Sequence, residues 1–265
     1  MANKVLEKTL NNASSEDLRA GYAAPSQVTD AFGNSTVPPG AFTGTADAMS
    51  VTGSARAALV LFAILVASGA WAWVTIPDSR AVIFLFGSLF IGLGLALATT
   101  FKPKIARITA PLYAAVEGVL LGTISRMYED AFNGIVVQAV LATGAIVFVM
   151  YTLYSTRILK VTERFRKVVI GATLGIVVFY MLSIFLSIFG VQMPFVWDSG
   201  PAGIIFSVFV VIIAASNLAL DFDFIERGSQ AGLPKYMNWA AAFGLVVTIV
   251  WIYLEVLRLL AKTRN

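Results

Sequence analysis

The chain has 265 residues, of which 58% are hydrophobic and 13% charged, and its formal net charge is +4 at pH 7. Soluble domains are about 45–50% apolar, so this composition indicates an integral membrane protein. Cysteine and histidine are absent, which excludes disulfides, thiolate chemistry, histidine metal ligands and imidazole catalysis. The basic residues lie in short connections between apolar runs, so they predict membrane topology rather than a nucleic-acid surface.

Residues 1–56 are rich in Ala, Ser, Thr, Gly, Asn and Pro and show no sustained apolar period. This composition predicts a mostly disordered tail. The tail has no apolar stretch near its start of the kind found in a cleaved signal peptide, so we expect the first apolar run to be a retained membrane anchor. The predicted domains are therefore the tail and a membrane domain at 57–265.

Seven apolar runs follow, each close to the roughly 20 residues that a helix needs to cross a hydrocarbon core of about 30 Å. The runs are continuous and do not alternate with polar residues, so they predict helices and not a β-barrel. The fold class is therefore an all-α integral membrane protein with seven transmembrane helices. They are expected at 57–76, 81–101, 108–127, 134–155, 168–190, 203–222 and 239–260.

Most lysine and arginine residues fall in the tail and in the second, fourth and sixth connections. The positive-inside rule therefore places the N-terminus in the cytoplasm and, with seven spans, the C-terminus on the other side. The basic C-terminal end argues against that second placement, so a re-entrant last segment is an alternative. Lys262 is expected to lie beyond the last span.

Two pairs of glycines have the spacing that lets membrane helices approach closely. Gly118 and Gly122 lie in the third predicted helix, and Gly171 and Gly175 lie in the fifth. Packing within the chain is the favoured interpretation, and dimerisation is the alternative.

An ionised side chain near the bilayer centre costs about 2.5–3.5 kcal/mol on insertion scales, so carboxylates inside the apolar runs are candidate functional residues. Glu117 lies midway along the third run, Asp221 ends the sixth, and Glu255 lies in the last. For Glu117 the sequence leaves two interpretations open, a role in gating and a structural role as a buried, hydrogen-bonded side chain. Glu255 precedes Arg258 by three residues, and this spacing favours an ion pair near the membrane interface.

Asp221 and Asp223 are about 200° apart around a helix, so we expect them to play different parts. Asp223 lies four residues before Arg227, which favours a local ion pair, and with Glu226 it is assigned to an acidic loop after the sixth helix. Asp221 has no local cation, so we expect it to contact another helix. Burial disfavours the ionised form of a carboxyl, so a chain without histidine could sense pH through Asp221.

Two segments carry a resemblance to a known family. SNLALDFDFIERGSQAGLPKYMNWAAAFGLVVTIVWIYLEVLRLL, at 216–260, and AAVEGVLLGTIS, at 114–125, resemble the Bax inhibitor family of membrane proteins, in particular a bacterial branch with an extended N-terminal tail. The resemblance implies seven helices with the last one central and wrapped by the other six, in the bacterial inner membrane. It also implies a pH-sensitive calcium leak, and some bacterial members are associated with a membrane-bound AAA protease.

The resemblance further implies a gate made of two aspartates, one late in the sixth helix and one in the seventh. Asp221 matches the first position, and Thr248 stands at the second. Thr248 could donate its hydroxyl to an ionised Asp221, and Glu117 and Glu255 are further candidate partners. Calcium prefers oxygen ligands, so Asp221 is also a candidate for transient calcium contact.

Three classes of function are compatible with a membrane protein of this composition. The expected function is a cation leak, with calcium or another cation as the permeant ion and no cofactor. The alternative is a non-transporting regulator that binds a membrane protease or other membrane proteins through the tail and the basic loops. An enzyme is not expected, because an aspartyl protease needs two opposed aspartates, whereas Asp221 and Asp223 lie on one segment.

Overall fold

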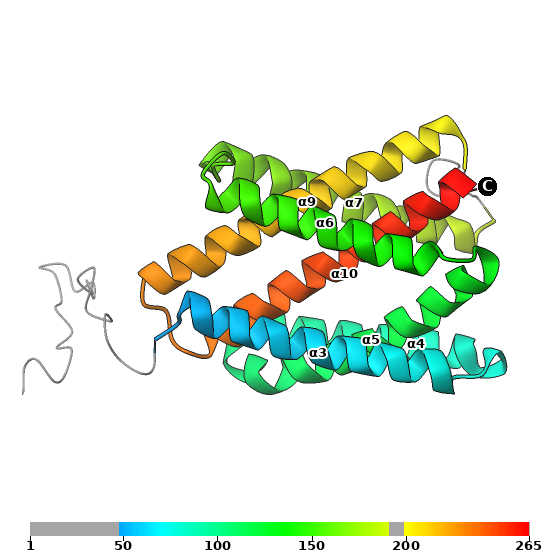
Figure 1. Ribbon diagram of the computed structural model, residues 1–265, viewed down its shortest axis with the longest axis horizontal. Helices are drawn as coiled ribbons and strands as arrows, with labels where there is room; N and C mark the ends of the chain where they lie inside the picture. Colours follow the sequence, from blue (N-terminus) through cyan, green and yellow to red (C-terminus); the bar gives the residue numbers. More distant parts are fainter. Residues whose placement is uncertain (1–47, 191–198, 265) are drawn as a thin grey trace, which may run out of the picture. The chain divides into compact units, whose positions relative to one another are not determined.

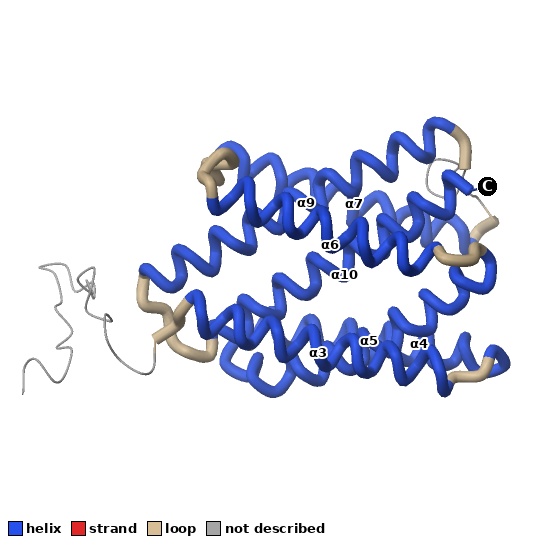
Figure 2. The backbone as a smooth tube through the Cα atoms, in the orientation of Figure 1, coloured by secondary structure: helices blue, strands red, loops and turns tan. Residues whose placement is uncertain are grey.

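The computed structural model describes residues 48–190 and 199–264, so most of the predicted tail lies outside the described residues. Met49–Asn265 forms one compact unit, in which short connections join long helices (Figure 2). Among the described residues, seven helices are long and apolar enough to cross a membrane, which confirms the predicted fold class. They are α3 (Val51–Thr75), α4 (Asp78–Phe101), α5 (Ala106–Ala131), α6 (Ile135–Ser155), α7 (Glu163–Ile188), α9 (Pro201–Gln230) and α10 (Met237–Arg264), with a short 3₁₀ turn, Pro103–Ile105, before α5.

The first helix begins at Val51 and not at the predicted residue 57. Ser50 caps it, because the Ser50 hydroxyl accepts a hydrogen bond of 3.0 Å from the Gly53 amide. The Asn238 side chain, at the start of α10, accepts from the Ser50 amide and from the Ser54 hydroxyl, both at 3.0 Å. The partner that fixes the start of α3 is thus more than 180 residues away in the chain, so no local pattern revealed it.

The helix α9 continues to Gln230 and does not end at the predicted residue 222. It stops only before Gly232, which has a φ of 66° in the left-handed region that favours glycine. Asp223 and Glu226 therefore lie on the helix, and their assignment to an acidic loop is wrong. The polar residues of this last part of α9 remain helical because side chains from α6 and α7 pair with them, as described below.

The last helix is the central one. In Figure 1, α10 runs between a group formed by α3, α4 and α5 and a group formed by α6, α7 and α9. It packs against α3, α5, α6 and α9, whereas α4 packs on α5 in an outer layer. The main apolar core is built around α10, where Val246, Ile252 and Leu257 are almost fully shielded. The outer helices instead carry exposed apolar side chains such as Phe90 and Val178, as expected for contact with lipid.

The last segment crosses the whole unit. With 28 residues, α10 is about 42 Å long, more than the hydrocarbon core requires, so the re-entrant alternative is wrong. At its end, Arg264 donates to the carbonyls of Phe132 and Asn133, at 3.3 and 2.9 Å, in the α5–α6 connection. The connections α4–α5, α6–α7 and α9–α10 lie at the other end, which we call the N-terminal side. Lys262 lies within α10 and is buried, contrary to the prediction that it follows the last span.

The two glycine pairs differ in their surroundings. A Cβ added at Gly122 of α5 would lie 2.2 Å from the Gly69 carbonyl oxygen of α3, and one at Gly118 would lie 2.3 Å from the Leu65 carbonyl oxygen. The backbones of α3 and α5 therefore touch, as the spacing predicted. A Cβ at Gly171 or Gly175 of α7 would meet nothing within 4 Å, so this pair packs against no described helix.

Candidate functional site

Asp221 lies on the side of α9 that faces α10. Its Oδ1 is 3.6 Å from the position that a Cβ on Gly244 would take, and Thr248, one turn further along α10, lies beside the same carboxylate. Its Oδ2 is shielded from solvent and has no hydrogen-bond partner in the described part of the chain. Buried carboxylate oxygens usually have donors, because their desolvation is otherwise uncompensated. Stability of the fold alone does not explain this carboxylate.

The Thr248 hydroxyl is engaged within its own helix. It donates to the Gly244 carbonyl at 3.1 Å, and a hydroxyl has one proton to donate. While this bond holds, the hydroxyl proton is directed to the Gly244 carbonyl, and a protonated Asp221 can donate to the Thr248 lone pairs. The donation to ionised Asp221 expected from the sequence therefore requires Thr248 to leave the Gly244 carbonyl.

Neither Glu117 nor Glu255 joins this site. Glu255 is eleven residues beyond Gly244 on α10, about 16 Å along the axis, and it pairs with Tyr180 and Arg258 at 3.0 and 3.2 Å. Glu255 is only 1% exposed, so the expected ion pair with Arg258 forms with its carboxylate shielded by the protein.

Glu117 is buried on α5 with one oxygen 3.2 Å from the position of a Cβ on Gly92, and it lies beside Tyr113. No hydrogen bond or ion pair among the described residues joins Glu117 to Asp221. Of the four residues predicted to form the gate, the structure brings together Asp221 and Thr248.

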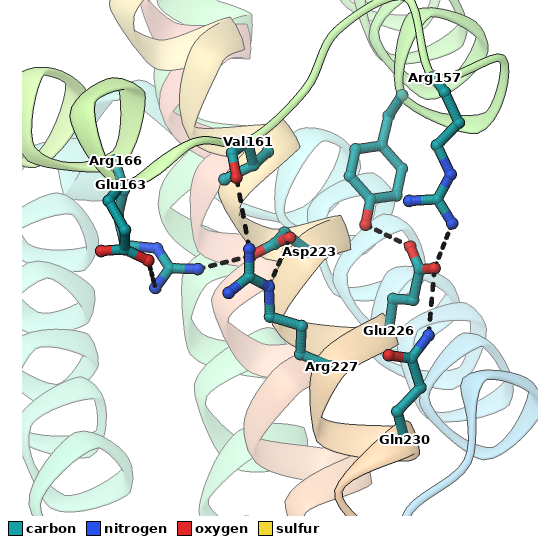
Figure 3. Close-up of polar contacts among 9 residues, drawn as sticks. Arg157, Val161, Glu163, Arg166, Asp223, Glu226, Arg227 and Gln230 are labelled. Atoms are coloured by element: carbon teal, nitrogen blue, oxygen red, sulfur yellow. Dashed lines mark hydrogen bonds and ion pairs between the residues drawn. The ribbon is translucent and has the colours of Figure 1, made fainter.

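Asp223 lies about 200° around α9 from Asp221. It forms a cluster of ion pairs (Figure 3). It accepts from Arg227 at 2.9 Å, the pair predicted from their spacing, and from Arg166 of α7 at 2.6 Å. Arg166 also pairs with Glu163 at 3.3 Å, and Arg227 donates to the Val161 carbonyl at 3.3 Å. Arg166 and Asp223 are 57 residues apart in the chain. Their ion pair therefore depends on how α7 and α9 pack, and the sequence did not predict it.

Glu226 forms a second cluster on the same helix (Figure 3). It accepts hydrogen bonds from the Tyr154 hydroxyl of α6, from Arg157, and from Gln230 at 3.3 Å. The hydrogen bond to Glu226 raises the pKa of Arg157 above its ordinary value, so this guanidinium stays charged. Together, the Asp223 and Glu226 clusters hold the end of α9 to α6, to α7 and to their connection, within two turns of Asp221.

The site offers a passing cation few protein ligands. No three carboxylates within residues 48–190 and 199–264 lie close enough to hold a metal ion together. A calcium ion at Asp221 would meet one carboxylate, with the Thr248 hydroxyl beside it. Such a contact suits an ion in transit, because calcium takes six to eight oxygen ligands in a stable site.

Within the described residues, the fold and this site define an integral membrane protein with seven candidate spans, in which a shielded carboxylate oxygen between the central helix and a neighbour has no hydrogen-bond partner. A family model described as "Bax inhibitor 1 like" matches residues 3–265, and the chain therefore belongs to that family. Neither the curated proteins nor the solved structures that were compared include a match to the chain.

Proposed function

We propose that this protein is a pH-sensitive cation leak channel that conducts calcium and is gated by Asp221 where α9 meets α10. The observation that carries the proposal is the shielded Oδ2 of Asp221, which has no partner among the described residues. Intramembrane carboxylates are costly and commonly line ion paths. The proposed setting is the bacterial inner membrane, with the N-terminal side in the cytoplasm and neither a cofactor nor an enzymatic reaction involved.

The two charge states of Asp221 favour different arrangements of α9 and α10. The protonated carboxyl is neutral and can donate to the Thr248 lone pairs, so it is compatible with the closed contact. The ionised Asp221 carboxylate faces Gly244 and Thr248 on α10, and neither residue carries a positive charge. The cations that reach this part of α9 are already paired with Asp223 and Glu226. A buried unpaired charge is strongly unfavourable. Ionisation therefore favours a conformation in which water or a cation reaches Asp221, and the leak rises with pH.

Replacement of Asp221 with asparagine is expected to abolish the pH dependence of the leak. The Asp221→Asn side chain cannot ionise, so calcium flux into dye-loaded proteoliposomes should stay, from about pH 5 to pH 9, at the low level that the native protein shows in acid. The matched control is Glu117→Gln, a buried carboxylate outside the site, which should keep the native pH profile. An Asp221→Asn profile that follows the native one would contradict the proposal.

Introduction of a second carboxylate is expected to move the pH profile. In Thr248→Asp, two adjacent carboxyls share a proton and the second charge forms only at higher pH. The pH at which calcium flux is half-maximal should therefore rise by about one unit or more. Thr248→Asn, which has a similar shape and no charge, should show no such rise, and equal midpoints in the two variants would remove Thr248 from the gate.

A folded native protein that gave no flux above empty liposomes at any pH would favour the regulator hypothesis. The measurement to make next would then be co-purification with a membrane protease, in the presence and absence of residues 1–47.

A further inference from the structure

A large cavity lies between α3 and α6, away from Asp221. Its volume is about 980 Å³, within the range of sites that hold a small organic ligand. α3 and α6 each pack against α10, and the cavity separates them, with α5 and α10 as its floor. Its walls include Phe62 of α3, Leu121 of α5, Phe148 of α6 and Val250 of α10.

The cavity offers water few free polar groups, one of which is the Thr143 hydroxyl, a shielded atom with no hydrogen-bond partner among the described residues. The hydroxyls of Ser125 and Tyr253 on its wall bond to each other at 2.6 Å. The Glu129 carboxylate accepts from the amides of Gly134 and Val136, at 2.6 and 3.0 Å. A buried water needs two to four polar partners, and an empty apolar cavity of this size forfeits the contacts that packed interiors make. Hydrocarbon is the filling that fits these walls.

The shape and the position of the cavity identify the hydrocarbon. The wall runs from Phe62 to Val74 on α3 and from Val136 to Tyr151 on α6, which are about 18 and 22 Å along the helices. One leaflet of a bilayer is about 15 Å of hydrocarbon deep. Trp73 and Glu129 lie at the end away from the N-terminal side, and tryptophan is enriched where acyl chains meet headgroups.

We propose that the cavity is a binding site for one acyl chain of a membrane phospholipid, which enters between α3 and α6 from the leaflet away from the N-terminal side. The chain fills the space against α5 and α10, and its headgroup lies at the level of Trp73. This lipid is distinct from the surrounding bilayer lipids, because its chain contacts four helices. It therefore exchanges slowly and remains with the protein through purification.

Two glycines give a matched test. Gly144 lines the cavity on α6, and Gly171 lies on α7 outside it, and a Cβ at either position would meet nothing within 4 Å. Gly144→Phe fills the cavity, whereas Gly171→Phe adds the same side chain elsewhere. The full-length native protein and both variants are purified in detergent, checked for helix content and monodisperse elution, and released intact in a mass spectrometer.

The native protein and Gly171→Phe should each retain one adduct with the mass of a phospholipid after the detergent is stripped, and Gly144→Phe should lose most of it. A native protein without an adduct, equal occupancy in the two variants, or an adduct with the mass of a free fatty acid would each overturn the proposal. Should Gly144→Phe elute as an aggregate, Gly144→Leu and Gly171→Leu provide the same comparison with a smaller side chain.

Discussion

Replacement of Glu255 with alanine is expected to lower the free energy of unfolding by about 3–5 kcal/mol, the cost of breaking a buried ion pair from one side. The Glu255 carboxylate is 1% exposed and accepts from Tyr180 and from Arg258. Its loss leaves the partly shielded Arg258 guanidinium with Tyr180, whose hydroxyl accepts from it at 2.7 Å and whose ring lies 5.0 Å from it. The measurement is an unfolding titration with a denaturing detergent in mixed micelles.

Two further variants separate the charge effect from lost packing. Glu255→Ala combined with Arg258→Ala leaves no unpaired charge, so its destabilisation should be smaller than the sum of the single variants by about 1–3 kcal/mol. Tyr180→Phe removes one hydroxyl and should cost about 1–1.5 kcal/mol. A double variant whose cost equals the sum of the single costs would show that Glu255 and Arg258 contribute independently.

Replacement of Gly122 with alanine is expected to destabilise the protein by about 2–3 kcal/mol, near the upper end for an overpacked position. The new Cβ would lie 2.2 Å from the Gly69 carbonyl oxygen, and this obstacle is backbone, which cannot rotate away. α3 must therefore move from α5 along the closest helix contact of the fold. The same detergent titration measures the loss.

Gly175 on α7 is the matched control for this substitution. A Cβ there meets nothing within 4 Å, and alanine is favoured over glycine inside a helix by about 0.5–1 kcal/mol. Gly175→Ala should therefore leave stability unchanged or raise it slightly, so the two variants should differ in sign. Native stability in Gly122→Ala would contradict the close approach of α3 and α5.

The amino-acid sequence by itself determined two kinds of feature: those that depend on the helix repeat, and those that depend on the transfer of apolar side chains from water into lipid. Seven apolar runs predicted seven spans, because each helix must satisfy its own backbone in lipid. The pairs Asp223–Arg227 and Glu255–Arg258 were predictable because the helix repeat places residues three or four apart on one face. The close approach at Gly118 and Gly122 followed from small side chains at one-turn spacing.

The tertiary structure decided which helix faces meet. Arg166, 57 residues before Asp223, keeps the end of α9 helical where the sequence predicted a loop. Asp221 meets Gly244 and Thr248, whereas Glu117 and Glu255 find other partners. The cavity between α3 and α6 is visible in neither helix separately. The rotation of each helix and the angle at which two helices cross depend on contacts between side chains far apart in the chain. These contacts form only when all the helices pack together, so the pattern within one helix does not predict them.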